Sequence, residues 1–199
     1  MDLKEKISYI IGRDMANNLA KQGITIDVDP FIKGMKEVQE GTPSSLSQEE
    51  VQQAMMALQQ EMAQKQNAAG SENQQVGEAF LAENKKREGV TTLDSGLQYQ
   101  VIEEGSGKSP SKNDTVTTHY HGTLIDGTVF DSSYARNEPA TFPVNGVIAG
   151  WTEALQLMKE GAKWRLFIPS NLAYGAQGAG EAIGPNATLV FDVELLAVK

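Results

Sequence analysis

Residues able to form a chemically useful cavity cluster in the C-terminal half of the chain. Asp126-Gly127 separates two β-prone segments, 123–125 and 128–130, and is typical of a tight turn. Phe130 and Asp131 follow this turn. Further on, Trp151 opens the segment 151–158, whose apolar residues recur at the spacing of one helical face. The pattern predicts an apolar pocket with an aromatic floor and one carboxylate.

Other kinds of catalytic site are not indicated. The residues Ser132, Ser133 and His119 do not stand in a nucleophile-elbow context. The glycine-rich segment 175–180 lacks the Lys-Ser/Thr pair of a phosphate loop, so we interpret it as a mobile flap, with a loop of no function as the alternative. His119 and His121 could share a metal, but no third ligand is near. We expect no metal and no cofactor.

Bulk composition excludes several classes of protein. The chain has 199 residues, a net charge of -9 and no cysteine. An acidic chain offers no basic face for nucleic acid, and the lack of thiols excludes disulfide frameworks and zinc-thiolate sites. No apolar run reaches the length of a membrane span. We expect a cytoplasmic protein if Met1 is the native start, and a periplasmic one if a signal peptide has been removed.

Residues 1–46 are predicted to form two short amphipathic helices. Asp2 and Glu5 form a capping-box pattern at the first, which ends at Gly23, and the second extends from Asp29 to Gly41. The first helix carries an apolar stripe of Ile7, Ile10, Ile11, Met15 and Leu19. Two such helices cannot enclose a core alone. We therefore expect this stripe to form a homodimer interface, with packing on the C-terminal half as the alternative.

A long connecting helix is predicted over residues 47–89. Ser47 and Glu50 form its capping-box pattern, and apolar residues follow at helical spacing. Gly70 is a possible kink, and a flexible polar linker over 66–75 is the alternative.

Beyond residue 90 the apolar period changes from 3.6 to 2. Strands are predicted at 97–103, 115–124, 140–144, 162–168 and 188–196. Antiparallel strands with one short helix after Trp151 give an α+β domain over 90–199, in which the helix covers one face of the sheet.

Several ordered blocks of this half resemble the FKBP peptidyl-prolyl isomerase family. The blocks are Tyr120, Asp126–Ser133, Val147-Ile148, Trp151, Ala173-Tyr-Gly175 and the segment 187–196. The resemblance implies a twisted antiparallel sheet wrapped on a short helix, with the pocket between them. The N-terminal half resembles the dimeric macrophage-infectivity-potentiator subgroup, which implies a V-shaped homodimer.

Site residues follow from the same resemblance. It implies catalytic roles for Asp131, Tyr174, Phe130 and Trp151, and substrate binding by Tyr120, Arg136, Phe142, Val147, Ile148, Ile183 and Phe191. In it Arg136 orients Asp131, while the Ile148 N–H and the Tyr174 phenol bond substrate carbonyls. Ala140 and Ala179 stand where relatives often have an aromatic residue and a histidine, so we expect a shallower rim.

The implied activity suits an apolar pocket. Rotation about an X-Pro bond faces a barrier of about 18–20 kcal/mol from amide resonance. Because the planar amide is the more charge-separated form, desolvation lowers this barrier. We expect an isomerase that acts on unfolded or Pro-containing proteins, that has chaperone activity as a dimer and that binds macrolide inhibitors. A non-catalytic binding module for Pro-containing segments is the alternative.

Overall fold

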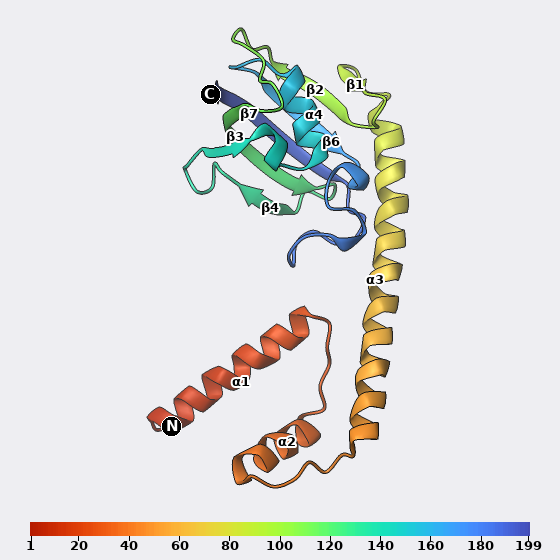
Figure 1. Cartoon of the computed structure of the whole chain (residues 1–199), viewed down its shortest axis with the longest axis vertical. Helices are drawn as coiled ribbons and strands as arrows, with labels where there is room; N and C mark the ends of the chain where they lie inside the picture. Colours follow the sequence, from red (N-terminus) through yellow and green to blue (C-terminus); the bar gives the residue numbers. More distant parts are fainter. The chain divides into compact units, whose positions relative to one another are not determined.

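The computed structural model describes residues 1–199, which form two compact units, 1–65 and 66–199. The first contains α1 (Leu3–Lys21), α2 (Val28–Glu40) and the beginning of α3 (Gln48–Asn84), and the second contains the rest of α3 and a β-sheet domain (Figure 1). The predicted α+β class, with an all-α region first, is confirmed.

The two short helices are capped as their sequences predict, with one correction. The Asp2 carboxylate accepts from Glu5 N at 2.8 Å, and Glu5 accepts from Asp2 N at 2.7 Å. The second helix begins at Val28 rather than Asp29, because Asp27 is its N-cap and accepts from Asp29 N. It ends where Gly41 adopts a left-handed conformation at φ 67°.

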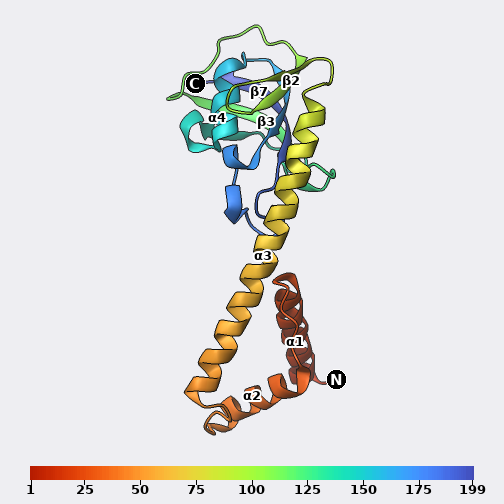
Figure 2. The same cartoon turned by 90° about the vertical axis from the view of Figure 1, so that its right-hand side faces the viewer.

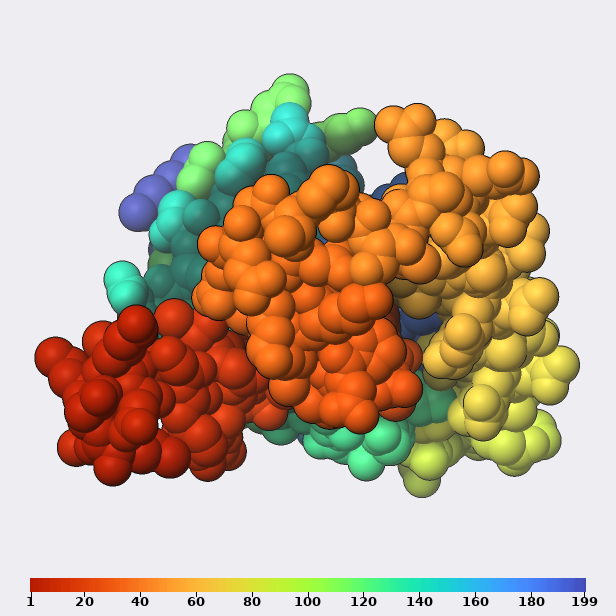
Figure 3. Space-filling model, turned by 90° about the horizontal axis from the view of Figure 1, so that it is seen from below, coloured from red at the N-terminus to blue at the C-terminus, as the bar shows by residue number.

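Apolar side chains on α1 and α2 lie at the surface. Neither helix has a buried residue, and both are visible as surface segments in the space-filling view (Figure 3). Ile10 is 56% exposed and Ile11 is 52% exposed. These helices bury no dry core of their own, as their length predicts.

α3 is one continuous helix through the polar segment 66–75, so the alternative of a flexible linker is wrong. Ser47 and Glu50 form the predicted capping box, with Ser47 N donating to Glu50 at 2.8 Å and Glu50 N donating to Ser47 Oγ at 3.2 Å. The helix ends at Asn84 rather than near residue 89. The Asn84 side chain is buried at this end and donates to Gln98 at 2.9 Å.

The sheet contains seven strands, and all its pairings are antiparallel. The strands are β1 (Val90–Thr92), β2 (Gln98–Glu103), β3 (Thr115–Leu124), β4 (Val129–Ser132), β5 (Ala140–Pro143), β6 (Lys163–Ile168) and β7 (Leu189–Val198). Their order is β1-β2-β6-β7-β3-β4, and β5 pairs with β3. Five strands lie where the period of 2 predicts. The short strands β1 and β4 are absent from that list, because three or four residues cannot establish an alternation, although the β-prone segment 128–130 after the tight turn overlaps β4.

Helices lie against both faces of this sheet (Figure 2). On one face, α4 (Ala149–Leu157) buries Trp151, Ala154 and Leu155. The helix begins two residues before Trp151 and packs closely enough that Gly150 lies beside Ile168 of β6. On the opposite face, Phe167 of β6 contacts Phe80 of α3, with ring centroids 6.0 Å apart. Because neighbouring strand residues point to opposite faces, Leu166 and Ile168 belong to the core under α4, whereas Phe167 packs on α3.

Candidate active site

A cavity of about 730 Å³ lies between α4, the sheet and the segment after β6. Its lining residues are Tyr120, Phe130, Asp131, Phe142, Gly146, Val147, Ile148, Trp151, Tyr174, Ala179, Gly180, Glu181, Ala182, Ile183 and Phe191. Most of these side chains are apolar or aromatic. The cavity is therefore able to hold an apolar ring with little water around it.

Trp151 forms the floor, and three aromatic rings surround it edge to face. Its ring centroid is 5.3 Å from Phe191, 5.4 Å from Tyr120 and 5.9 Å from Phe142, with interplanar angles of 81–88°. Trp151 is 4% exposed, and its indole N–H has no hydrogen-bond partner. Edge-to-face packing fixes the orientation of this floor.

The wall beside the floor depends on the absence of a side chain at Gly122. Phe130 packs edge to face on Phe191 at 5.3 Å, and both rings lie across the position that a Gly122 side chain would occupy. Any larger residue at this position in β3 would displace the two rings. The tight turn at Asp126-Gly127 returns the chain so that Phe130 and Asp131 reach this wall.

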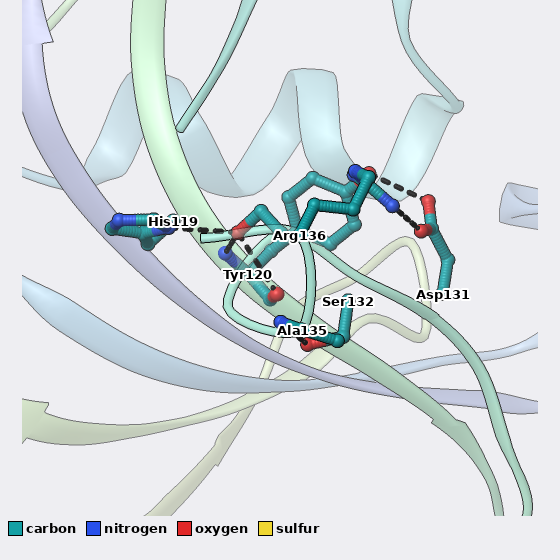
Figure 4. A network of polar contacts seen from close by, with 7 residues as sticks. His119, Tyr120, Asp131, Ser132, Ala135 and Arg136 are labelled. Carbon is teal, nitrogen blue, oxygen red and sulfur yellow. Dashed lines mark hydrogen bonds and ion pairs between the residues drawn. The ribbon is translucent and has the colours of Figure 1, made fainter. Parts of the chain in front are cut away.

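The one carboxylate predicted for the pocket is held from two sides (Figure 4). Tyr120 donates its hydroxyl hydrogen to Asp131 Oδ2 at 2.6 Å. Arg136 forms an ion pair with Asp131 Oδ1 and donates to the Tyr120 hydroxyl at 2.8 Å. Both carboxylate oxygens are thus engaged within the protein.

These contacts change the acid–base properties of the group. Partial burial acts to raise the pKa of the Asp131 carboxyl, but hydrogen bonds from Tyr120 and Arg136 outweigh it, and the pKa is lowered. Burial raises the pKa of the Tyr120 hydroxyl, and the neighbouring carboxylate raises it further. The hydrogen bond to Asp131 raises the pKa of Arg136. At neutral pH the site therefore contains a paired carboxylate and a neutral phenol.

A second layer of contacts, missed by the sequence analysis, fixes the Tyr120 backbone (Figure 4). Tyr120 N donates to Ser133 Oγ at 2.7 Å, and His119 Nδ1 lies 2.9 Å from the same oxygen. Ser133 is fully buried. The alternation of side chains along β3 is enough to place His119 on the outer face of the sheet. The position of Ser133 beside it depends on the turn after β4, which no local sequence pattern indicates.

Tyr174, Ile148 and the segment 179–183 make up the rim. Tyr174 is 40% exposed, and neither its hydroxyl nor the Ile148 N–H bonds another group of the chain. The segment 179–183 is a narrow hairpin, in which Ala179 N donates to Ile183 O at 2.8 Å and Ile183 N donates to Ala179 O at 3.1 Å. The rim thus offers two hydrogen-bond groups beside an apolar edge.

The predicted pocket residues are brought together with one exception. Arg136 is outside the lining and contacts the cavity only through Asp131 and Tyr120. Ala140 is also outside the lining, whereas the small residues Ala179, Gly180 and Ala182 are part of it. Gly146 and Glu181 line the cavity although no local pattern singles them out.

Comparison with known families agrees with this geometry. Residues 106–196 match the family described as FKBP-type peptidyl-prolyl cis-trans isomerase, and residues 4–101 match the domain amino terminal to such isomerases. The chain belongs to the FKBP-type peptidyl-prolyl cis-trans isomerases. The match in the N-terminal half also confirms the resemblance to the subgroup with a helical region ahead of the isomerase domain.

Relatives of this isomerase share nearly its whole length. Outer membrane protein MIP of Legionella longbeachae is 46% identical over 200 residues, which cover 98% of this chain and 86% of the relative. The FKBP-type 22 kDa peptidyl-prolyl cis-trans isomerase of Escherichia coli is 44% identical, covering 98% and 96%. The crystal structure of FkpA from Escherichia coli matches with a TM-score of 0.73 and 42% identity, covering 100% of this chain and 97% of that one. No helix of this isomerase is both long and apolar enough to cross a membrane.

Proposed function

We propose that this isomerase rotates X-Pro bonds by removing them from water inside the aromatic cavity. The observation that carries the proposal is the arrangement of Trp151, Phe130 and Phe191 around a space in which the Asp131 carboxylate is already paired with Arg136. No proton acceptor is needed, since rotation neither makes nor breaks a bond. An apolar environment destabilises the charge-separated, planar amide more than it destabilises the twisted amide, so the barrier to rotation is lowered.

Each group has a distinct part in this proposal. Trp151 supports the prolyl ring, and Phe130 excludes water from one side. Tyr174 and the Ile148 N–H donate to carbonyl oxygens of the bound peptide, which suits their lack of partners within the chain. An acceleration of about 10⁶ requires roughly 8 kcal/mol, so these contacts must favour the twisted amide over the planar one.

The same proposal includes a homodimer that acts as a chaperone. The α1 stripe leaves Ile7, Ile10 and Ile11 about half exposed, and a second copy of the chain would cover it. Two cavities in one assembly would then bind two segments of the same unfolded protein, the second at high effective concentration. Macrolide inhibitors would occupy the cavity weakly, because Ala179, Gly180 and Ala182 give the rim little apolar area.

A refolding assay limited by proline isomerisation tests this function. The wild-type chain should accelerate the slow refolding phase at substoichiometric concentration and should also accelerate isomerisation of a short X-Pro peptide. Binding of the unfolded protein without any change in the slow phase would favour the alternative, a non-catalytic module that recognises Pro-containing segments.

A further inference from the structure

Two hydrogen bonds join α3 to the segment that follows the rim hairpin. Asn73 Nδ2 donates to Pro185 O at 2.9 Å, and Asn186 Nδ2 donates to Gly70 O at 3.2 Å. Asn73 lies 112 residues before Pro185, and Gly70 lies 116 residues before Asn186. Both are hydrogen bonds from a side chain to a backbone oxygen, between partly buried groups. In one the donor side chain belongs to α3, and in the other it belongs to the segment after the hairpin.

The surfaces of α3 and this segment approach closely at two glycines. A side chain carbon at Gly70 would lie 3.2 Å from Asn186 Nδ2 and 3.4 Å from Pro185 Cβ. A carbon at Gly184 would lie 3.1 Å from Asn73 Nδ2. Asn186 itself has φ 56°, a left-handed conformation that asparagine tolerates better than most residues. The two glycines and the left-handed backbone of Asn186 therefore permit this close contact.

The segment 183–186, which contacts α3, also forms the base of the rim hairpin. Asn186 N donates to Gly175 O at 2.8 Å, which fixes the residue directly after Tyr174. Ile183 is 7% exposed, lines the cavity and closes the hairpin with Ala179. One short stretch, 183–186, thus contacts α3 on one side and holds two parts of the rim on the other.

α3 is a fixed support because its last turns are anchored in the sheet domain. Asn84 donates to Gln98 at 2.9 Å, and Gln98 in turn donates to Leu81 O at 2.9 Å. Asn84 and Gln98 are both buried. Gly77 contacts Thr188 so closely that no side chain would fit between them. Residues 66–84 of the helix are accordingly part of the same compact unit as the active site.

We propose that Asn73 is a positioning residue of the isomerase site, which acts through Pro185 to hold the hairpin 179–183 over the cavity. Asn73 does not line the cavity, so its effect must pass through this segment. The inference rests on the proposed function, because it assigns the hairpin a part in holding the prolyl peptide. It also makes the second half of α3 a component of the active-site domain rather than a spacer.

The test compares Asn73→Ala with Asn67→Ala in the full chain. Asn67 lies on the same helix, and its side chain is exposed and makes no hydrogen bond. Both alanine variants therefore gain the same helix propensity. Asn73→Asp is a second variant, because it keeps the size of the side chain but cannot donate to Pro185 O. Amide hydrogen exchange at Ala179 and Ile183 reports the hairpin, and kcat/KM on a short X-Pro peptide reports the site.

In both Asn73 variants we expect exchange at Ala179 and Ile183 to accelerate, and kcat/KM to fall roughly tenfold, as loss of a positioning contact does. The amides of β7 should keep their protection, and Asn67→Ala should match the wild type. Unchanged exchange at the hairpin, or faster exchange that extends equally to β7, would overturn the positioning role. If the wild type itself has no isomerase activity, the proposed function fails, whereas the exchange measurement still decides whether Asn73 holds the hairpin.

Discussion

Tyr120 and Asp131 stand on neighbouring strands and are joined by a 2.6 Å hydrogen bond from phenol to carboxylate. Arg136 donates a hydrogen bond to the second oxygen of the Asp131 carboxylate. A carboxylate with both oxygens engaged and a lowered pKa is a poor proton acceptor. It can instead present a fixed electrostatic field to the bound amide, which agrees with a reaction that transfers no proton.

The first prediction concerns Asp131→Leu. We expect kcat/KM on a short X-Pro peptide to fall about tenfold or more, because the fixed charge beside the amide is lost. The free energy of unfolding should fall by about 1–3 kcal/mol, because Tyr120 is 7% exposed and loses the acceptor of its hydroxyl hydrogen. Arg136 adds little to this cost, because it is 49% exposed and keeps its hydration when its partner is removed.

Asp192→Leu is the matched control. Asp192 also pairs with an arginine, Arg165, at 2.6 and 2.8 Å, but it lies outside the cavity lining. This variant should keep wild-type kcat/KM. A folded Asp131→Leu protein with undiminished turnover would show that the carboxylate has no catalytic part.

The second prediction concerns pH. Because the folded-state pKa of Asp131 is lowered, the group stays ionised at and below the ordinary aspartate value of about 3.9. The stability that it contributes is present above that unfolded value and is lost as pH falls through the folded pKa. We therefore expect kcat/KM to show no Asp131-dependent step between about pH 5 and 8. A bell-shaped profile whose acid limb vanishes in Asp131→Leu would indicate general acid–base catalysis instead.

The third prediction concerns the floor. Trp151→Ala should abolish most of the activity and cost about 3–5 kcal/mol of unfolding free energy, because the indole is 4% exposed and three rings pack on it. Trp151→Phe should retain more of both, since it keeps an aromatic floor and removes an N–H that has no partner. Chemical denaturation and peptide kinetics measure the two effects. Equal activity in the two variants would exclude the ring as the support of the prolyl group.

Much of this site could be predicted because its parts are local. Phe130 and Asp131 directly follow a tight turn, and the Trp151 helix has a clear apolar period, so short stretches of sequence specify them. Contacts made through tertiary structure carry no such signal. The bond of Ser133 to Tyr120 and that of Asn73 to Pro185 join residues on separate elements. The polar composition of 66–75 leaves a flexible linker open as an alternative to the predicted helix, and nothing in it indicates that Gly70 lies against Pro185 and Asn186.

The fourth prediction concerns association through α1. Ile10→Asp with Ile11→Asp should yield a monomer, because carboxylates in an apolar interface oppose its burial. The fold of each copy should survive, since both side chains are more than half exposed within one chain. Light scattering measures the mass. Lys6→Asp with Arg13→Asp is the control, because helical spacing places these residues away from the stripe. A double Ile variant that stays dimeric, or a control that dissociates, would contradict the assignment.

The last prediction compares two fragments, 66–199 and 90–199. The first retains the α3 turns that cover Phe167, Gln98 and Thr188, all of which are 3–5% exposed in the full chain. The second uncovers all three, as well as the hairpin base at Pro185. We expect 66–199 to be a folded monomer, with peptide kcat/KM close to that of the full chain, and 90–199 to lose about 3 kcal/mol or more of stability.

Both fragments should act more weakly than the full chain on an unfolded protein, because each offers a single cavity. Only 90–199 should also be weaker on the short peptide, since it lacks Asn73 and Gly70, the contacts that hold the segment 183–186. Thermal denaturation and peptide kinetics of the two fragments separate these effects. If 90–199 equalled 66–199 in both stability and peptide turnover, the second half of α3 would be a connecting element and not part of the active-site domain.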